Sequence, residues 1–177
     1  STPPRTNAKY FSGKINWFKT RELNDSVLFK SEERITQEAV SRANLKIQPP
    51  GAVLIAMYGA TIGRLGILSE ESTTNQACCT ITSKNDVYPL IYIFQWLKAN
   101  KEFILNLRMG AAQQNISQEI VRNLEIDIPN NLVLLKEYAL RIENCYATIK
   151  KYMAQNIILA NSRDQLLPKL MSGEIEV

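Results

Sequence analysis

The chain has 177 residues, of which 45% are hydrophobic, so it is long enough to bury a core and is not disordered throughout. Its formal net charge of +4 is compatible with a polyanionic partner but does not by itself indicate one. Histidine is absent and no CxxC pair occurs, which excludes Ser-His-Asp and Cys-His catalysis and most zinc sites.

The first predicted element is a helix over residues 31–43. Ser31 is placed to accept a hydrogen bond as the N-cap, and the two glutamates that follow it suit the positive end of the helix dipole. The sequence PPG over residues 49–51 then marks a turn.

Three strands are predicted next. The apolar run over residues 52–58 is bounded by turn residues, which favours a buried strand. After a glycine-rich loop over residues 59–63, residues 65–68 are expected to form its hairpin partner. Residues 77–82 are expected to form a further strand.

A second helix is predicted from Pro89, which suits a first helical turn, to a point before Gly110. Its apolar positions recur at helical spacing and are Ile93, Trp96, Leu97, Ile104 and Leu107. A short helix over residues 117–122 and a strand over residues 124–128 follow. The expected result is an α+β domain of mixed short strands and helices over residues 1–130.

The last part, residues 131–177, is predicted to hold one long helix over residues 132–167, stopped by Pro168. Read in sevens, its a positions are Leu135, Ile142, Ile149, Asn156 and Arg163, and its d positions are Tyr138, Cys145, Tyr152, Leu159 and Leu166. This repeat favours a coiled coil, in which Asn156 would fix the register. About 35 residues give a rod on the order of 50 Å long, which exceeds what one small domain covers. Docking on its own domain is the alternative, and pairing with another chain is favoured.

The opening segment, residues 1–5, is neither a signal peptide nor a transit peptide, and no apolar stretch approaches membrane-spanning length. The three cysteines, Cys78, Cys79 and Cys145, read as reduced thiols. We therefore expect a cytoplasmic protein without membrane contact.

Six segments of the sequence together carry a resemblance to a known family. The carboxyl end reads RDQLLPKLMSGEI over residues 163–175, and the opening segment contains Thr2-Pro3, Asn7, Tyr10-Phe11, Gly13-Lys14-Ile15 and Trp17. Between them lie GAVLI (51–55), GATIG (59–63), TNQA (74–77) and GAAQQNIS (110–117). On these segments, in this order, the sequence resembles the specificity subunits of type I restriction-modification systems. The opening segment is similar to the start of that family's recognition domains, and the carboxyl end is similar to the end of its spacer helices.

The resemblance implies a non-catalytic DNA reader. Such subunits usually hold two target recognition domains and two antiparallel spacer helices, and each domain reads one half of a split target in double-stranded DNA. Catalysis belongs to the methyltransferase (M) and restriction (R) subunits, so S-adenosylmethionine, ATP and magnesium are expected only there. This sequence has one copy of each part. It is either a natural half subunit that pairs with itself, as a homodimer reading a split palindrome, or a fragment of a full one.

Candidate DNA contacts are cations for phosphates and amides for base edges. They are Lys14, Lys19, Arg21, Tyr58, Thr61, Arg64, Gln113 and Gln114. The loop over residues 58–64 would let the backbone approach DNA, or would be a plain hairpin turn with Arg64 solvated. The amides, and likewise Asn75 and Gln76, would either contact bases or brace the fold. The stretches 19–30 and 83–88 match no family segment and are expected to carry the choice of target.

Two other functions remain open from the residues alone. The chain contains no methyltransferase-like Asn-Pro-Pro-Tyr motif, and the glycine-rich loop lacks the Lys-Ser/Thr of a P-loop. One alternative is a recognition domain detached from a fused restriction-methylation enzyme, which would be a monomer. The other is a coiled-coil interaction protein that does not read DNA.

Overall fold

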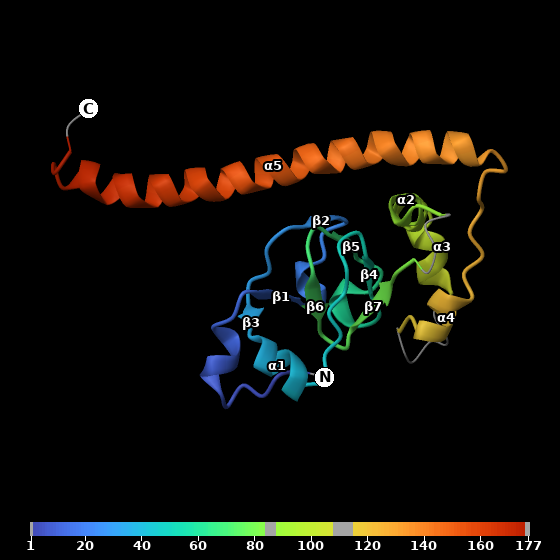
Figure 1. The fold of residues 1–177 in the computed structure, drawn as a ribbon, viewed down its shortest axis with the longest axis horizontal. Coiled ribbons are helices and arrows are strands. Elements are labelled where there is room, and N and C mark those ends of the chain that lie inside the picture. Colours follow the sequence, from blue (N-terminus) through green and yellow to red (C-terminus); the bar gives the residue numbers. More distant parts are fainter. Residues whose placement is uncertain (1, 84–87, 108–114, 176–177) are drawn as a thin grey trace.

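The computed structural model describes residues 2–83, 88–107 and 115–175. Figure 1 shows a small mixed α+β domain with one long helix laid across one side of it. The expected fold class is confirmed. No helix in these ranges is both long enough and apolar enough to cross a membrane.

The first sheet has three short strands in the order β3-β1-β6. Strand β1 (Ile15–Phe18) pairs antiparallel with β3 (Arg34–Ile35) and parallel with β6 (Ser72–Thr74). None of these strands was predicted, because each is short and its partners lie far away in the sequence.

The second sheet has four strands in the order β2-β5-β4-β7. They are β2 (Ser26–Leu28), β4 (Val53–Ala56), β5 (Leu65–Leu68) and β7 (Cys78–Ile81). The predicted hairpin is confirmed, since β4 and β5 are antiparallel with Val53 opposite Ile67. Every residue of these two strands is buried. The sheet therefore has core on both faces, which explains why its central strands read as continuous apolar runs.

The α-helices of the described residues lie around the sheets (Figure 1). Their bounds are α1 (Gln37–Arg42), α2 (Leu90–Ala99), α3 (Lys101–Asn106), α4 (Gln118–Arg122) and α5 (Leu132–Met171). Three short 3-10 helices lie at Ala8–Phe11, Thr20–Glu22 and Gly59–Thr61. Helix α2 packs Phe94 and Leu97 onto the second sheet, where both side chains are fully buried. This contact forms the largest part of the core.

The first predicted helix begins later than its sequence signal. Ser31 is not an N-cap, because its Oγ accepts the N–H of Trp17 at 3.1 Å and its own N–H donates to Oδ1 of Asn16 at 3.2 Å. These bonds tie the segment to β1 and make room for β3. The helix starts only after Thr36, whose Oγ1 accepts the N–H of Ala39 at 3.2 Å.

The second predicted helix is two helices, which meet at Asn100. The Asn100 side chain donates to the carbonyl of Trp96 at 2.9 Å and so competes with the helical hydrogen bond at that point. The following short helix, α4, is confirmed with Ser117 as its N-cap.

The predicted strand over residues 124–128 is wrong. Leu124 and Ile126 are half-buried, as its alternation suggested, but the segment belongs to none of the strands in the described part of the chain. Instead, Tyr92 of α2 donates its hydroxyl to the carbonyl of Asp127 at 2.5 Å. The segment is therefore a connection held against α2.

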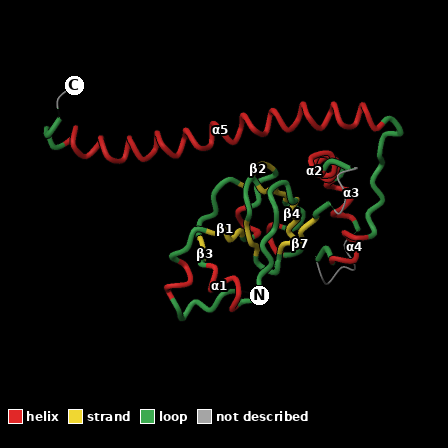
Figure 2. The backbone as a smooth tube through the Cα atoms, viewed as in Figure 1, coloured by secondary structure: helices red, strands yellow, loops and turns green. Residues whose placement is uncertain are grey.

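The long helix is confirmed but extends four residues beyond its predicted end. Figure 2 shows α5 as one continuous helix that continues past the edge of the domain. Pro168 lies inside the last turns, where it removes one helical hydrogen bond without ending the helix. The end is set by Gly173 at φ +70°, after which the N–H of Glu174 donates to the carbonyl of Lys169 at 2.9 Å.

Candidate nucleic-acid interface

The glycine-rich loop between β4 and β5 presents two of the predicted DNA contacts to solvent. Tyr58 and Arg64 are exposed, while Thr61 is half-buried. Within the described residues, the guanidinium of Arg64 has no ion pair. Tyr58 forms an isolated bridge to Asn115, so two of the segments predicted to read DNA lie side by side. Gln113 and Gln114 themselves lie outside the described residues.

The same loop has a structural requirement of its own. Gly63 has φ +75°, and a Cβ there would lie 2.7 Å from Cδ2 of Leu105 in α3. This glycine is therefore needed for backbone geometry and for close packing, whether or not the loop touches DNA. That result supports the turn interpretation for Gly63 and leaves Arg64 as the side chain that can reach a phosphate.

The cations of the first segment differ in how they are bound. Lys14 is exposed, but the Lys19 ammonium lies 2.5 Å from Glu33 and 5.2 Å above the ring of Trp17. Arg21 is exposed and forms an ion pair with Glu32. Lys19 and Arg21 remain predicted contacts, although each would have to exchange or share its carboxylate to bind a phosphate.

Glu33 is the centre of this network. Besides Lys19, it accepts a bidentate contact from Arg5, with distances of 2.9 and 3.0 Å. The hydrogen bonds from Arg5 and then Lys19 lower the pKa of Glu33 to about 2. A carboxylate held by two cations stabilises the fold of the first segment, and it cancels positive charge that was available to DNA.

Helix α5 has two different faces. Leu135 and Ala139 are buried against the domain, and Ile142, Tyr146 and Met153 pack on the same core. Leu135 and Met153 are 18 residues apart, about five turns of 3.6 residues, so these side chains lie on one straight line along the helix. We call them the docking face.

Two of the predicted coiled-coil positions, Leu135 and Ile142, pack against the chain's own domain. A seven-residue repeat drifts by about 20° per heptad around a straight helix. Because of this drift, the a positions begin on the docking face and leave it only at Ile149. The other predicted positions form an exposed outer stripe, about a quarter turn from the docking face, made of Tyr138, Cys145, Ile149, Tyr152, Asn156, Leu159, Arg163 and Leu166. Of these, Tyr138 also touches its own domain, edge-on against Tyr92.

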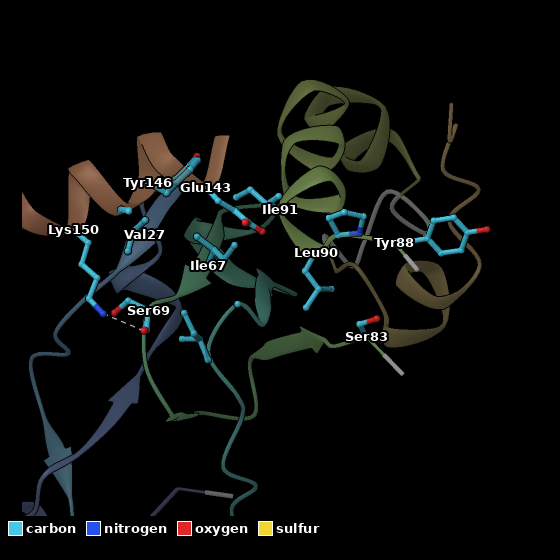
Figure 3. A pocket seen from close by; sticks show the side chains of 14 residues that line it. Val27, Ile67, Ser69, Ser83, Tyr88, Leu90, Ile91, Glu143, Tyr146 and Lys150 are labelled. Atoms are coloured by element: carbon cyan, nitrogen blue, oxygen red, sulfur yellow. Dashed lines mark hydrogen bonds between the residues drawn. The ribbon is translucent and has the colours of Figure 1, made fainter. Parts of the chain in front are cut away.

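Figure 3 shows a cavity between α5 and the domain. It has a volume of about 470 Å³, and its walls include Val27 and Ile67 from the sheet and Tyr146 from α5. At one side, Lys150 donates to the carbonyl of Ser69 at 3.3 Å and helps to hold the helix in place. The cavity is part of the contact between helix and domain.

The described residues contain no group of three His, Cys, Asp or Glu side chains that could hold a metal ion. The cysteines Cys78, Cys79 and Cys145 are free thiols, and burial raises the pKa of Cys78 to about 12.

Sequence reasoning missed one concave surface altogether. A polar groove of about 1030 Å³ runs along β7 and is lined by residues of four separate segments, among them Lys46, Gln48, Gln118 and Arg122. No local pattern joins these residues, because only the fold brings them together. The amides Asn75 and Gln76, which the sequence left open, line the same groove.

Comparison with known proteins gives one consistent answer. The sequence profile described as "Type I restriction modification DNA specificity domain" matches residues 2–134. The specificity subunit of the type I restriction enzyme MjaIX from Methanocaldococcus jannaschii is 29% identical over 73% of this chain and 31% of its own length. The specificity subunit of the HindI enzyme from Haemophilus influenzae is 21% identical over 98% of this chain and 38% of its own.

Solved structures have the same fold. The S subunit of a type I restriction-modification system from M. genitalium superposes on 96% of this chain with a TM-score of 0.67 at 11% identity. The HsdS subunit from Thermoanaerobacter tengcongensis superposes on 98% with a TM-score of 0.56 at 14% identity. This chain covers 42% of each, so it spans less than half the length of the proteins it resembles.

Proposed function

Because the chain belongs to the type I restriction modification DNA specificity domain family, we propose that it is a non-catalytic specificity subunit that reads one half of a split DNA target. Its recognition domain contacts double-stranded DNA. Its long helix joins it to a second recognition domain. The relatives from M. jannaschii and H. influenzae are specificity subunits.

The observation that carries this proposal is the outer stripe of α5. Tyr152 is 61% exposed and Leu159 is 65% exposed, on a helix whose other face is already occupied by its own domain. Large apolar side chains aligned on one helix face indicate a protein contact. A second copy of α5 offers the same stripe, and Asn156 lies within it to fix the register.

Two-fold pairing of α5 places two copies of the recognition domain in one assembly. In a closed two-fold dimer the same surface is presented twice, in opposite orientations. The target is then a split palindrome, with two copies of one half-site in inverted orientation and a gap set by the helices.

The chemistry of restriction and methylation lies elsewhere in this proposal. Methyltransferase (M) and restriction (R) subunits dock on the specificity subunit and hold S-adenosylmethionine, ATP and magnesium. The assembly acts in the cytoplasm, where its DNA is. The chain itself supplies recognition.

Selection from a pool of duplexes with a randomised centre tests this function. The purified chain is incubated with the pool at low salt, the bound duplexes are recovered and amplified, and the cycle is repeated. We expect enrichment of one short half-site that occurs twice, inverted, with a fixed gap. A single unrepeated site would support DNA reading but overturn the pairing. That is the result expected of a recognition domain detached from a fused enzyme. No enriched sequence would overturn the proposed function and leave a coiled-coil interaction protein.

A further inference from the structure

The polar groove along β7 lies at the edge of the second sheet. In the strand order β2-β5-β4-β7, strand β2 lies at one edge and contacts α5, while β7 forms the opposite edge. The groove is bounded by the segment after α1, by β7 and by α4, and no residue of α5 lines it. In Figure 1, α5 and β7 lie on opposite sides of the sheet. A molecule bound in the groove would therefore leave the outer stripe of α5 accessible.

The polar side chains along the groove are cations, amides and hydroxyls, and they lie beside apolar side chains such as Ile93, Leu97 and Leu124. Lys46 and Arg122 are exposed and form no ion pair within the described residues. No carboxylate belongs to the described lining, in contrast to the surroundings of Lys19 and Arg21, where glutamates neutralise the positive charge. Gln76 and Gln118 are exposed at its edges. Cations without counter-charges beside exposed amides match the chemistry of protein–DNA contacts.

Gln48 adds a second, independent observation. Its side chain is only 8% exposed, and its backbone is fixed by reciprocal hydrogen bonds with Ser72 at 2.7 and 3.1 Å. Its Oε1 has no hydrogen-bond partner in the described part of the chain. An unpaired buried acceptor is unfavourable, so this position favours a ligand that brings a donor. Phosphates bring none, whereas adenine and cytosine both present an amino group in the major groove.

We propose that the groove along β7 is the surface with which the recognition domain reads DNA. Lys46 and Arg122 bind phosphates of one strand, Gln76 and Gln118 contact base edges, and Gln48 reorients its buried amide to accept from a base amino group. This inference rests on the proposed function and assigns it to residues that the sequence did not bring together. The groove also contains the TNQA segment, of which Asn75 holds Cys78 while Gln76 stays free to contact DNA.

The test compares variants of the full chain, using the randomised duplex pool and the duplex that wild type selects from it. Lys46→Gln removes one phosphate contact, so the slope of log affinity against log salt should fall by about one. Gln118→Ala removes a base contact, so discrimination at one base pair should fall at least about fivefold. Lys46 should also be protected from acetylation when that duplex is bound.

Two matched controls accompany them. Lys151→Gln changes an exposed lysine on α5, and Gln37→Ala changes the exposed first residue of α1, as Gln118 is the first residue of α4. Neither control should change the salt slope or the selected sequence. If wild type selects a sequence but both groove variants keep its slope and its preference, the groove proposal is overturned and the proposed function stands. If wild type selects nothing, the proposed function fails and the groove proposal fails with it.

Discussion

Glu33 binds one of the cations predicted to contact DNA. It holds Arg5 and Lys19 at once, and Lys19 is the predicted contact. Arg64 differs, because it is exposed beside a glycine-rich loop and has no ion pair in the described residues. At the residue scale, Lys19 would therefore have to share or exchange Glu33 to bind a phosphate, whereas Arg64 would not have to give up an ion pair.

Glu33→Gln should lower the free energy of unfolding by about 1 kcal/mol at neutral pH, because Arg5 is largely exposed and exposed pairs contribute little. The pKa of Glu33 is lowered on folding, so the stability it contributes is present above its unfolded value and is lost as the pH falls through about 2. Urea unfolding of both proteins checks this result. The gap between them should close between pH 4.5 and pH 2, and a gap that widens on acidification would contradict the assignment.

Arg64→Gln should weaken DNA binding without changing stability, because the side chain is exposed and the turn itself depends on the glycines. The expected change is a decrease of about one in the salt slope. Fluorescence anisotropy with a labelled duplex over a range of salt concentrations measures it. An unchanged slope would remove Arg64 from the contact surface and leave the loop as a plain hairpin turn.

At the element scale, predictability follows how local the signal is. Strands β4, β5 and β7 follow from apolar runs, and α4 follows from its own N-cap. Strand β2 could not be found this way, because three residues carry no period and its partner β5 lies about 40 positions away. The start of α1 was misplaced because the Ser31 hydroxyl bonds β1, which is a tertiary contact.

The candidate site divides in the same way. The loop between β4 and β5 was visible as a motif and is exposed, as expected. The groove along β7 was not visible as a motif, because its lining comes from separate segments. Lys46 lies more than 70 residues before Gln118 and Arg122. Only part of the heptad repeat in α5 lies on the exposed outer stripe. It could not show that the same helix would also bury Leu135 and Ala139 against its own domain.

Leu135→Ala should lower the free energy of unfolding by about 2–5 kcal/mol, because Leu135 is 1% exposed and its truncation leaves a cavity between α5 and the domain. The neighbouring Leu134 is 56% exposed, and Leu134→Ala should change stability by no more than about 0.5 kcal/mol. Urea unfolding at low protein concentration compares the two variants. Equal effects would mean that α5 is not docked through Leu135.

At the scale of the whole molecule, α5 has a docking face that packs on its own domain and an outer stripe that is exposed. Its docking face fixes the helix to one recognition domain, through Leu135, Ala139 and Tyr146. Its outer stripe continues beyond that domain toward Leu166, where side chains remain exposed (Figure 1). If two chains pair through the outer stripe, as we propose, the spacing of the two recognition domains is set by the helices. The gap in the proposed DNA target would then follow from the length of the helix.

The outer stripe makes a sharp prediction about neighbouring residues. Leu159 lies on the stripe and is 65% exposed, while Ile158 is 64% exposed but lies about 100° around the helix. Leu159→Glu should therefore abolish self-association, whereas Ile158→Glu should leave it unchanged. Because both side chains are exposed, neither change should affect the fold of the recognition domain, which circular dichroism checks.

Sedimentation equilibrium over a range of protein concentrations tests the central claim most directly, that two copies of this chain pair through α5. We predict a mass near twice that of the chain for wild type and for Ile158→Glu, and the mass of one chain for Leu159→Glu. A wild-type monomer at every concentration, or dimers that persist equally in both variants, would contradict pairing through the outer stripe.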